Sequence, residues 1–212
     1  MRLKNKVAIV SGGSRDIGRA VSLQLAKEGA KVVVNYFDSK ELADETLKLI
    51  REAGGEAIAV QADMTKAAEV EALVAETRKA FGDEINVLVN VVGGLVARKT
   101  TAEMDENFWD FVMNVNLKSV FLAVKSVSPF MPSGSSIVNF SSLAARDGGS
   151  NADSDGGSND GSNKGSDGQR KRQKSRQQQA AMAAATAAKI ASATGSDRQQ
   201  QRQQCGGSNS GS

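Results

Sequence analysis

Apolar and polar residues follow two different periods along the chain, up to about residue 140. Short runs rich in Val, Ile and Ala predict five β-strands, at residues 7–11, 31–36, 56–61, 86–90 and 136–140. Longer amphipathic segments between them predict helices at 16–28, 39–53, 66–81 and 101–130, and the last is long enough to be broken. This alternation favours parallel βαβ units covered by helices on both faces. Because such crossovers are right-handed, we expect an α/β fold with the doubly wound strand order 3-2-1-4-5.

A Rossmann-like sheet of this kind has its ligand crevice at the carboxyl ends of the first and fourth strands. From Val7 to Gly18 an apolar strand runs into a glycine-rich turn that opens a helix. Backbone N–H groups in such a turn, with the helix N-terminus, can cradle a pyrophosphate if glycines let the chain approach closely. Gly12, Gly13 and Gly18 meet that requirement, so the sequence predicts dinucleotide binding. The alternative is an ordinary tight turn between a strand and a helix.

The composition changes near Gly148. From Ser150 to Ser212 there is no Leu, Val, Phe, Trp, Tyr or Pro. Such a segment cannot bury enough apolar surface to offset a chain entropy of roughly 1–2 kcal/mol per ordered residue. We therefore divide the chain into a dinucleotide-binding domain, 1–149, and a low-complexity polar tail, 150–212. We expect the tail either to be disordered, with at most a solitary helix within 177–194, or not to represent the true polypeptide.

The net charge of +3 arises in the tail, which holds nine Lys and Arg against five Asp. The rest of the chain holds 18 basic and 19 acidic residues, so the charge is no evidence that the folded part binds nucleic acid. The basic run at 170–176 has no interleaved aromatic residues to stack on bases, which favours a solvated charge run. A nucleic-acid contact through this run is the alternative.

Several classes of chemistry are excluded or disfavoured by residue counts. The chain has no histidine, which excludes histidine catalysis, and its single cysteine, Cys205, excludes an intramolecular disulfide. We assign no metal site. No apolar run reaches about 18 residues, and the N-terminus lacks the apolar stretch of a signal peptide. We expect a soluble, cytoplasmic protein without a membrane partner.

The spacing Ser11-Gly12-x-x-x-Asp16-Ile17-Gly18 resembles the TGxxxGxG loop of the short-chain dehydrogenase/reductases (SDRs), with Ser for Thr and Asp for the middle Gly. Further segments follow in the family's order. They resemble its adenine-binding Asp, its NNAG motif, the stretch with its active-site Asn, and the strand that ends in its active-site Ser: 62–64, 90–93, 114–117 and 137–142. The nearest resemblance within the family is to the 3-oxoacyl-acyl-carrier-protein reductases and related ketone reductases.

The resemblance implies a set of cofactor-binding residues: Ser11, Gly12, Ser14, Arg15, Ile17, Gly18, Asn35, Tyr36, Asp63, Met64, Asn90 and Gly93. It also implies two catalytic residues, Asn116 and Ser142. Taken singly, these residues have equally good structural interpretations. Asp63 could be a helix N-cap, the two Asn side chains could be structural amides, and Ser142 could be a strand-end hydroxyl.

The choice between NAD(H) and NADP(H) depends on the end of the second strand. An acidic side chain there accepts from a ribose 2′-hydroxyl, whereas a 2′-phosphate needs a basic or neutral pocket. Asn35 and Tyr36 stand at that place, and Arg15 resembles the basic residue of NADP-preferring members, which favours NADP(H). Asp38 argues in the other direction, and Arg15 could simply be solvated.

The family mechanism that the resemblance implies cannot be completed from this sequence. A tyrosine, its pKa lowered by the lysine of a YxxxK motif, donates the proton while the nicotinamide delivers hydride. The only tyrosine is Tyr36, and residues 154–159 stand where the family has its catalytic tyrosine. The family's sixth and seventh strands also have no counterpart. Either the polypeptide ends in a polar tail, or the sequence after Gly149 is not the true chain.

Three hypotheses remain. The first is an NADP(H)-dependent oxidoreductase acting on a ketone or secondary alcohol, and the second is a catalytically silent nucleotide-binding protein. The third is a nucleic-acid-associated protein acting through its tail. The helix with Phe108, Trp109, Phe111, Val112, Val115 and Leu117 resembles one that relatives pack between subunits, with plain core packing as the alternative. We expect a homo-oligomer, dimer or tetramer, only if the missing C-terminal elements are present.

Overall fold

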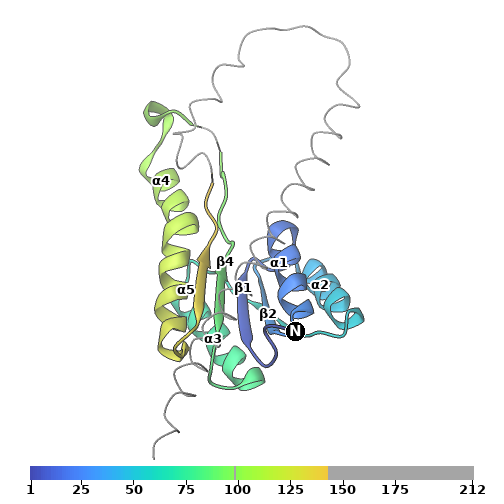
Figure 1. Ribbon diagram of the computed structural model, residues 1–212. Helices are drawn as coiled ribbons and strands as arrows, with labels where there is room; N and C mark the ends of the chain where they lie inside the picture. Colours follow the sequence, from blue (N-terminus) through green and yellow to red (C-terminus); the bar gives the residue numbers. More distant parts are fainter. Residues whose placement is uncertain (98, 143–212) are drawn as a thin grey trace, which may run out of the picture.

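The computed structural model describes residues 1–97 and 99–142, and these contain a five-stranded, fully parallel sheet (Figure 1). The strands lie in the order β3-β2-β1-β4-β5, which confirms the predicted topology. Their bounds are β1 Val7–Ser11, β2 Lys31–Tyr36, β3 Glu56–Gln61, β4 Val87–Asn90 and β5 Ser136–Asn139. The end of the proposed domain at 149 and the polar tail at 150–212 lie outside the described residues, so the domain division stays a prediction.

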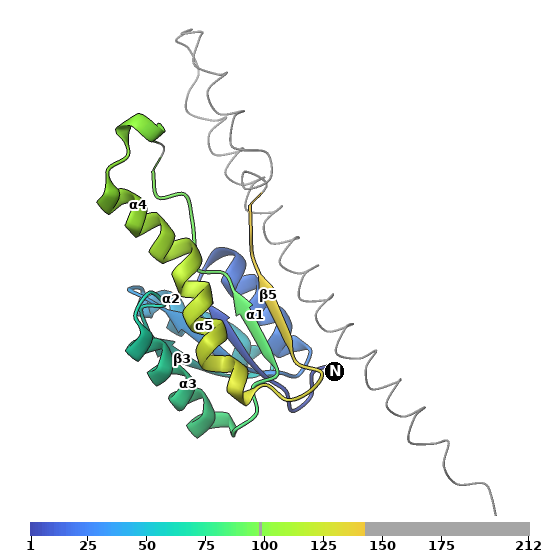
Figure 2. The same ribbon diagram turned by 90° about the vertical axis from the view of Figure 1, so that its left-hand side faces the viewer.

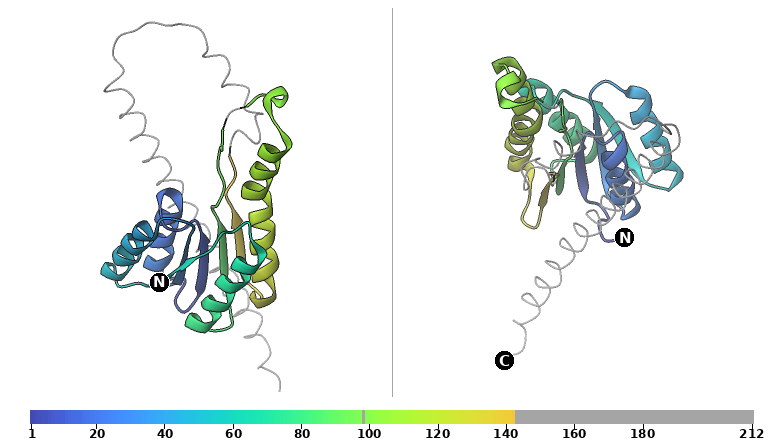
Figure 3. Two further views of the ribbon diagram at one scale, coloured as in Figure 1. Left: turned by 180° about the vertical axis from the view of Figure 1, so that it is seen from behind. Right: turned by 90° about the horizontal axis from the view of Figure 1, so that it is seen from above.

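Helices cover both faces of the sheet, as Figure 3 shows with the strands standing between two layers. Their bounds are α1 Asp16–Lys27, α2 Lys40–Glu52, α3 Ala67–Phe81, α4 Glu106–Met113 and α5 Ser119–Val127. Successive strand residues point to opposite faces. In β1, Ala8 and Val10 therefore join the core beneath α1 and α2, while Ile9 joins the core beneath α3 and α5. All three side chains are fully buried, and β1 is apolar up to its last residue, Ser11, as expected of a central parallel strand.

The helix predicted at 101–130 is interrupted twice. A 3₁₀ turn, Thr101–Glu103, precedes α4, and a π-helical turn, Asn114–Lys118, joins α4 to α5. Asp105 is the N-cap of α4, because its carboxylate accepts a hydrogen bond of 2.7 Å from the backbone N–H of Phe108. The two helices still form one nearly continuous rod in Figure 2. A π turn adds a residue to one turn and often marks a functional site, and Asn116 lies within this one.

The loop after β4 and the start of α4 rise beyond the carboxyl edge of the sheet, at the top of Figure 1. The loops after β1, β2 and β3 begin at the same edge, since all strands are parallel. This edge therefore gathers every segment that the sequence analysis singled out for cofactor binding. Among the described residues, no helix combines the length and the apolar character needed to cross a bilayer.

Candidate functional site

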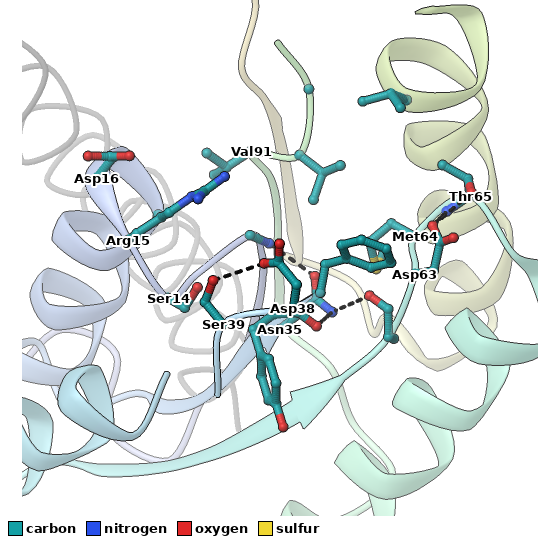
Figure 4. Close-up of a pocket in the computed structure, with 18 of the residues that line it drawn as sticks. Ser14, Arg15, Asp16, Asn35, Asp38, Ser39, Asp63, Met64, Thr65 and Val91 are labelled. Carbon is teal, nitrogen blue, oxygen red and sulfur yellow. Dashed lines mark hydrogen bonds between the residues drawn. The ribbon is translucent and has the colours of Figure 1, made fainter. Parts of the chain in front are cut away.

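A cavity of about 1050 Å³ opens at the carboxyl edge of the sheet (Figure 4). Its walls come from the loops after β1, β2, β3 and β4, with a contribution from α4 and the π turn. The lining residues are Gly12, Ser14, Arg15, Asp16, Ile17, Gly18, Asn35, Tyr36, Phe37, Asp38, Ser39, Ala62, Asp63, Met64, Thr65, Val91, Val92, Gly93, Phe111 and Val115. Ten of the twelve predicted cofactor-binding residues are among them. The remaining two, Ser11 and Asn90, are not.

Two glycines of the glycine-rich loop cannot be replaced without strain, Gly12 because of its backbone conformation and Gly18 because of close packing. Gly12 has a φ of +63°, in the left-handed region. A Cβ on Gly18 would lie only 1.9 Å from the carbonyl oxygen of Gly12, so α1 and the loop touch backbone to backbone. Asp16 also has a positive φ, +47°, at the position where the family motif has glycine. Its carboxylate therefore stands at the first residue of α1 in a conformation that favours glycine.

Asn35 ties three loops together from a buried position. Its side-chain oxygen accepts a hydrogen bond of 3.0 Å from the Gly12 N–H, and its amide donates one of 3.0 Å to the Ala62 carbonyl. Its own carbonyl accepts from the Gly13 N–H at 2.8 Å. The side chain lines the cavity and is 1% exposed. With both ends of its amide engaged, Asn35 acts as a brace for the glycine-rich loop, a role that the sequence analysis did not foresee.

The rim at the end of β2 is formed by residues beyond Asn35 and the buried Tyr36. Phe37 is 63% exposed there, and the Asp38 carboxylate accepts a hydrogen bond of 2.9 Å from the Ser39 hydroxyl. Figure 4 shows Arg15, Asp38 and Ser39 on one side of the cavity, across from Asp63 and Thr65. From the sequence, Asp38 counted only as an objection to NADP(H), and Phe37 and Ser39 were not predicted as site residues. Their place directly after a buried strand was the available signal.

Asp63 closes a turn at the end of β3. One of its carboxylate oxygens accepts hydrogen bonds from the backbone N–H and the hydroxyl of Thr65, at 2.9 and 2.7 Å. Its own N–H donates to the Glu69 carboxylate at 2.7 Å. The N-cap of α3 is Lys66, so Asp63 is not the helix cap that the sequence left open. The neighbouring Met64 is buried and also lines the cavity.

Ser11 and Asn90 support the cavity from behind. The Ser11 hydroxyl accepts hydrogen bonds from the N–H groups of Val91 and Val92, at 3.0 and 3.2 Å. The Asn90 amide donates one of 2.8 Å to the side-chain oxygen of Asn139, which joins β4 to β5. Both side chains are almost fully buried, at 1% and 3% exposure. In the described structure Asn90 has the structural role that was kept as its alternative, and Ser11 has a structural role that was not predicted from the sequence.

Asn116 holds the loop that follows β4. Its side-chain oxygen accepts a hydrogen bond of 2.9 Å from the Gly94 N–H, and its amide donates to the carbonyls of Gly94 and Val112 at 3.2 and 3.0 Å. A Cβ on Gly93 would lie 2.9 Å from the same oxygen. The π turn thus presents an amide that fixes the loop at the mouth of the cavity.

Ser142 is the last described residue and lies three positions beyond β5, with an exposed side chain. Neither it nor Asn116 is among the residues that line the cavity. Phe111 and Val115, which precede Asn116 on the same rod, line it instead. The structure therefore gathers ten of the twelve predicted cofactor residues into one cavity and leaves the two predicted catalytic residues outside its lining.

Comparison with known proteins identifies the family. The family model for short chain dehydrogenase matches residues 6–158. An uncharacterized oxidoreductase of Methylorubrum extorquens is 42% identical over 142 residues, covering 67% of this chain and 56% of that protein. The 3-oxoacyl-acyl-carrier-protein reductase FabG of Staphylococcus epidermidis is 39% identical over 146 residues, covering 68% and 59%. The chain thus spans less than two thirds of the length of these relatives.

A solved structure agrees. A short chain dehydrogenase from Burkholderia cenocepacia, described in complex with NADP, superposes with a TM-score of 0.65 at 34% identity. The match covers 69% of this chain and 59% of that one. The chain has the family's motifs in the family's order and a parallel sheet like that of the similar solved structures, and the family model matches it over 6–158. This chain therefore belongs to the short-chain dehydrogenase/reductase family.

Proposed function

We propose that the chain is an NADP(H)-dependent oxidoreductase that transfers hydride between nicotinamide and a ketone or secondary alcohol, with 1–149 as its dinucleotide-binding domain. The observation that carries the proposal is the cavity of about 1050 Å³, whose wall joins the glycine-rich loop to the ends of β2 and β3. Ligand pockets run to roughly 1,000 Å³, so a dinucleotide is a fitting occupant. The backbone contact at Gly18 supports a phosphate cradle, because a side chain there would fill the space that α1 needs against the loop.

The residues of the cavity suit the parts of a dinucleotide. The N–H groups of the glycine-rich loop and the N-terminus of α1 would hold the pyrophosphate. The Arg15 guanidinium would pair with a 2′-phosphate, and Asp63 with Met64 would face the adenine. When bound, the cofactor supplies the hydride at its nicotinamide ring.

Preference for NADP(H) over NAD(H) rests on the balance between Arg15 and Asp38. A guanidinium binds a phosphate through charge-assisted hydrogen bonds, whereas a carboxylate accepts from a free 2′-hydroxyl and repels a phosphate. Asp38 accepts one hydrogen bond, from Ser39, and keeps further acceptor sites, so the proposal of NADP(H) rests on Arg15. The Burkholderia relative described with bound NADP supports the same choice.

On the substrate side we assign roles to Ser142 and Asn116. The Ser142 hydroxyl would donate a hydrogen bond to the substrate carbonyl, and Asn116 would keep the loop after β4 in place for it. The apolar side chains of Phe111 and Val115 would exclude water from that end of the cavity. The only tyrosine, Tyr36, is buried at the end of β2, so it would not serve as the proton donor. Loss of a general acid costs about 10²- to 10⁴-fold in rate.

A second function has a specific observation in its favour. No tyrosine follows Tyr36, so no YxxxK pair follows Ser142, where the family has it; the only tyrosine with a lysine four residues later is Tyr36 with Lys40, between β2 and α2. A catalytically silent nucleotide-binding protein would carry the same cavity. The two functions agree on cofactor binding and differ only in turnover.

The test combines calorimetric titration of the full 212-residue chain with an assay of NADPH oxidation by a β-keto ester. We expect NADPH to bind more tightly than NADH, and Arg15→Ala to weaken NADPH roughly tenfold while leaving NADH nearly unchanged. Asp38→Asn should raise the preference for NADPH. Arg51→Ala, on the exposed end of α2, is the control for charge loss. Failure to bind either cofactor would refute the proposal, whereas binding without turnover would support the silent protein.

We also propose that the protein forms a homo-oligomer through the outer face of the α4–α5 rod when the family's C-terminal elements are present. Trp109, Leu117 and Phe121 are 54%, 58% and 59% exposed on this rod, an unusual gathering for a surface that meets only water. With those elements present, light scattering after gel filtration should give a dimer or tetramer, and Leu117→Lys with Phe121→Lys should reduce it to a monomer. A monomeric full-length enzyme would refute the assembly.

A further inference from the structure

Arg19 joins the glycine-rich loop to α2 without lining the cavity. Its Nε donates hydrogen bonds to the Ser14 carbonyl at 3.1 Å and to the Thr46 hydroxyl at 2.9 Å. Its Nη2 donates to the Leu42 carbonyl at 3.3 Å and pairs with the Glu45 carboxylate at 2.7 Å. The side chain is 23% exposed, so the guanidinium is held in a largely enclosed position between two helices.

The Ser14 carbonyl is the point where these bonds meet the loop. It accepts from Arg19 and also from the hydroxyl of the fully buried Thr46, which lies 2.9 Å from this carbonyl and 2.9 Å from that of Leu42 and shares one proton between them. One residue earlier, the Gly13 carbonyl lies 3.3 Å from the Ser22 hydroxyl of α1, which has a closer acceptor in the Gly18 carbonyl at 2.8 Å. Two successive peptide carbonyls thus face side chains of the flanking helices, and that of Ser14 is the more firmly held.

Holding these carbonyls also sets the direction of the N–H groups beyond them. The peptide unit is planar and trans, so each N–H points opposite to the carbonyl of the preceding residue. Carbonyls of Gly13 and Ser14 that point to Ser22, Arg19 and Thr46 turn the N–H groups of Ser14 and Arg15 the other way. Both of these residues line the cavity.

We propose that Arg19 is a positioning residue for phosphate binding: with Thr46 it fixes the Ser14–Arg15 peptide so that its N–H faces the anion. The inference rests on the proposed cofactor function. Arg19 itself does not touch the cofactor, and its effect depends on the fork of the guanidinium rather than on its charge. Lysine keeps the charge and loses the fork, so Arg19→Lys separates the two contributions.

The decisive experiment titrates the full chain and four variants with NADPH. Arg19→Lys and Thr46→Val should each weaken NADPH binding roughly tenfold, and the double variant should be little worse than either, because both act on one carbonyl. Arg51→Lys, the same exchange at an exposed site of α2, should bind as the wild type does. Melting curves fix a titration temperature at which every variant is folded.

A second pair of probes separates positioning from general loosening. ADP carries phosphates and adenosine does not, so Arg19→Lys should weaken ADP and leave adenosine unchanged in an NMR titration. If Arg19→Lys weakened ADP and adenosine equally, or bound NADPH as tightly as Arg51→Lys does, the positioning role of Arg19 would be overturned. The proposed cofactor function would still stand. A wild-type chain that binds neither NADPH nor NADH would refute the proposed function, and the inference with it.

Discussion

The side-chain oxygen of Asn35 lies 3.0 Å from the backbone nitrogen of Gly12, so one buried amide at the end of β2 holds the glycine-rich loop after β1. The same amide donates to the Ala62 carbonyl at the end of β3. Three loops of the cavity therefore share a single polar brace. Its donor and acceptor ends are not interchangeable, because they face an N–H on one side and a carbonyl on the other.

Asn35→Asp should be strongly destabilising. The carboxylate has no donor to offer the Ala62 carbonyl, and it places a charge at a site that is 1% exposed. We expect the free energy of unfolding to fall by about 3 kcal/mol in urea titrations. Asn107→Asp, an exposed exchange on α4, is the matched control. A loss no larger than that of the control would contradict the bracing role.

Two glycines should respond very differently to alanine: Gly18, in the first turn of α1, and Gly54, which follows α2 with a positive φ. Gly18→Ala would put a Cβ 1.9 Å from the Gly12 carbonyl oxygen, and that contact is with backbone on both sides. We expect the variant to unfold or to lose its cofactor site. Gly54 has a φ of +76° but has no neighbour within 4 Å of its Cβ position, so Gly54→Ala should cost only about 1 kcal/mol. Thermal unfolding of the two variants measures the difference, and similar melting temperatures would contradict the close contact between Gly18 and Gly12.

Asp16 places both strain and negative charge at the start of α1. Asp16→Gly removes the strain of φ +47°, but it also removes a helix-dipole interaction of about 0.3–1 kcal/mol, so stability should change little. The effect on cofactor affinity should be larger than the effect on stability, because the substitution removes a carboxylate from beside the proposed pyrophosphate position. We expect several-fold tighter NADPH binding in calorimetry. Asp16→Asn, which keeps an αL-tolerant side chain, should give the same gain, and unchanged affinity in both variants would show that the carboxylate stays away from the phosphates.

Arg2 lowers the pKa of Glu28 through side-chain hydrogen bonds, backed by a backbone bond, and so ties the N-terminus to the end of α1. A carboxyl whose folded pKa is depressed stabilises the fold above its unfolded pKa, about 4.3, and loses that contribution as the pH falls through the folded value. The wild type should therefore be more stable than Glu28→Gln at pH 7, and the gap should close in acid. Urea titrations at several pH values measure the gap. Glu71→Gln, on the exposed face of α3, should show none.

Much of the architecture was predictable from the sequence. The strand order follows from apolar runs such as 7–11 and 31–36, whose alternation with amphipathic segments leaves right-handed crossovers as the only compact solution. The site at the carboxyl edge follows from that topology and from the glycine spacing at Gly12 and Gly18. Local periodicity suffices for these conclusions because a parallel sheet is buried on both faces, which requires apolar strands and amphipathic helices.

The roles of individual polar residues were decided only by the tertiary structure. Asn35, Ser11 and Asn90 were expected at the cofactor, yet their side chains bond to backbone groups or, for Asn90, to the Asn139 side chain, across 23 to 81 positions of the sequence. The bonds of Arg19 to Thr46 have the same character, spanning 27 positions. A hydrogen bond depends on the position and direction of both partners to within a few tenths of an ångström. Periodicity determines which face a residue occupies, and only the packed chain determines which atom it meets.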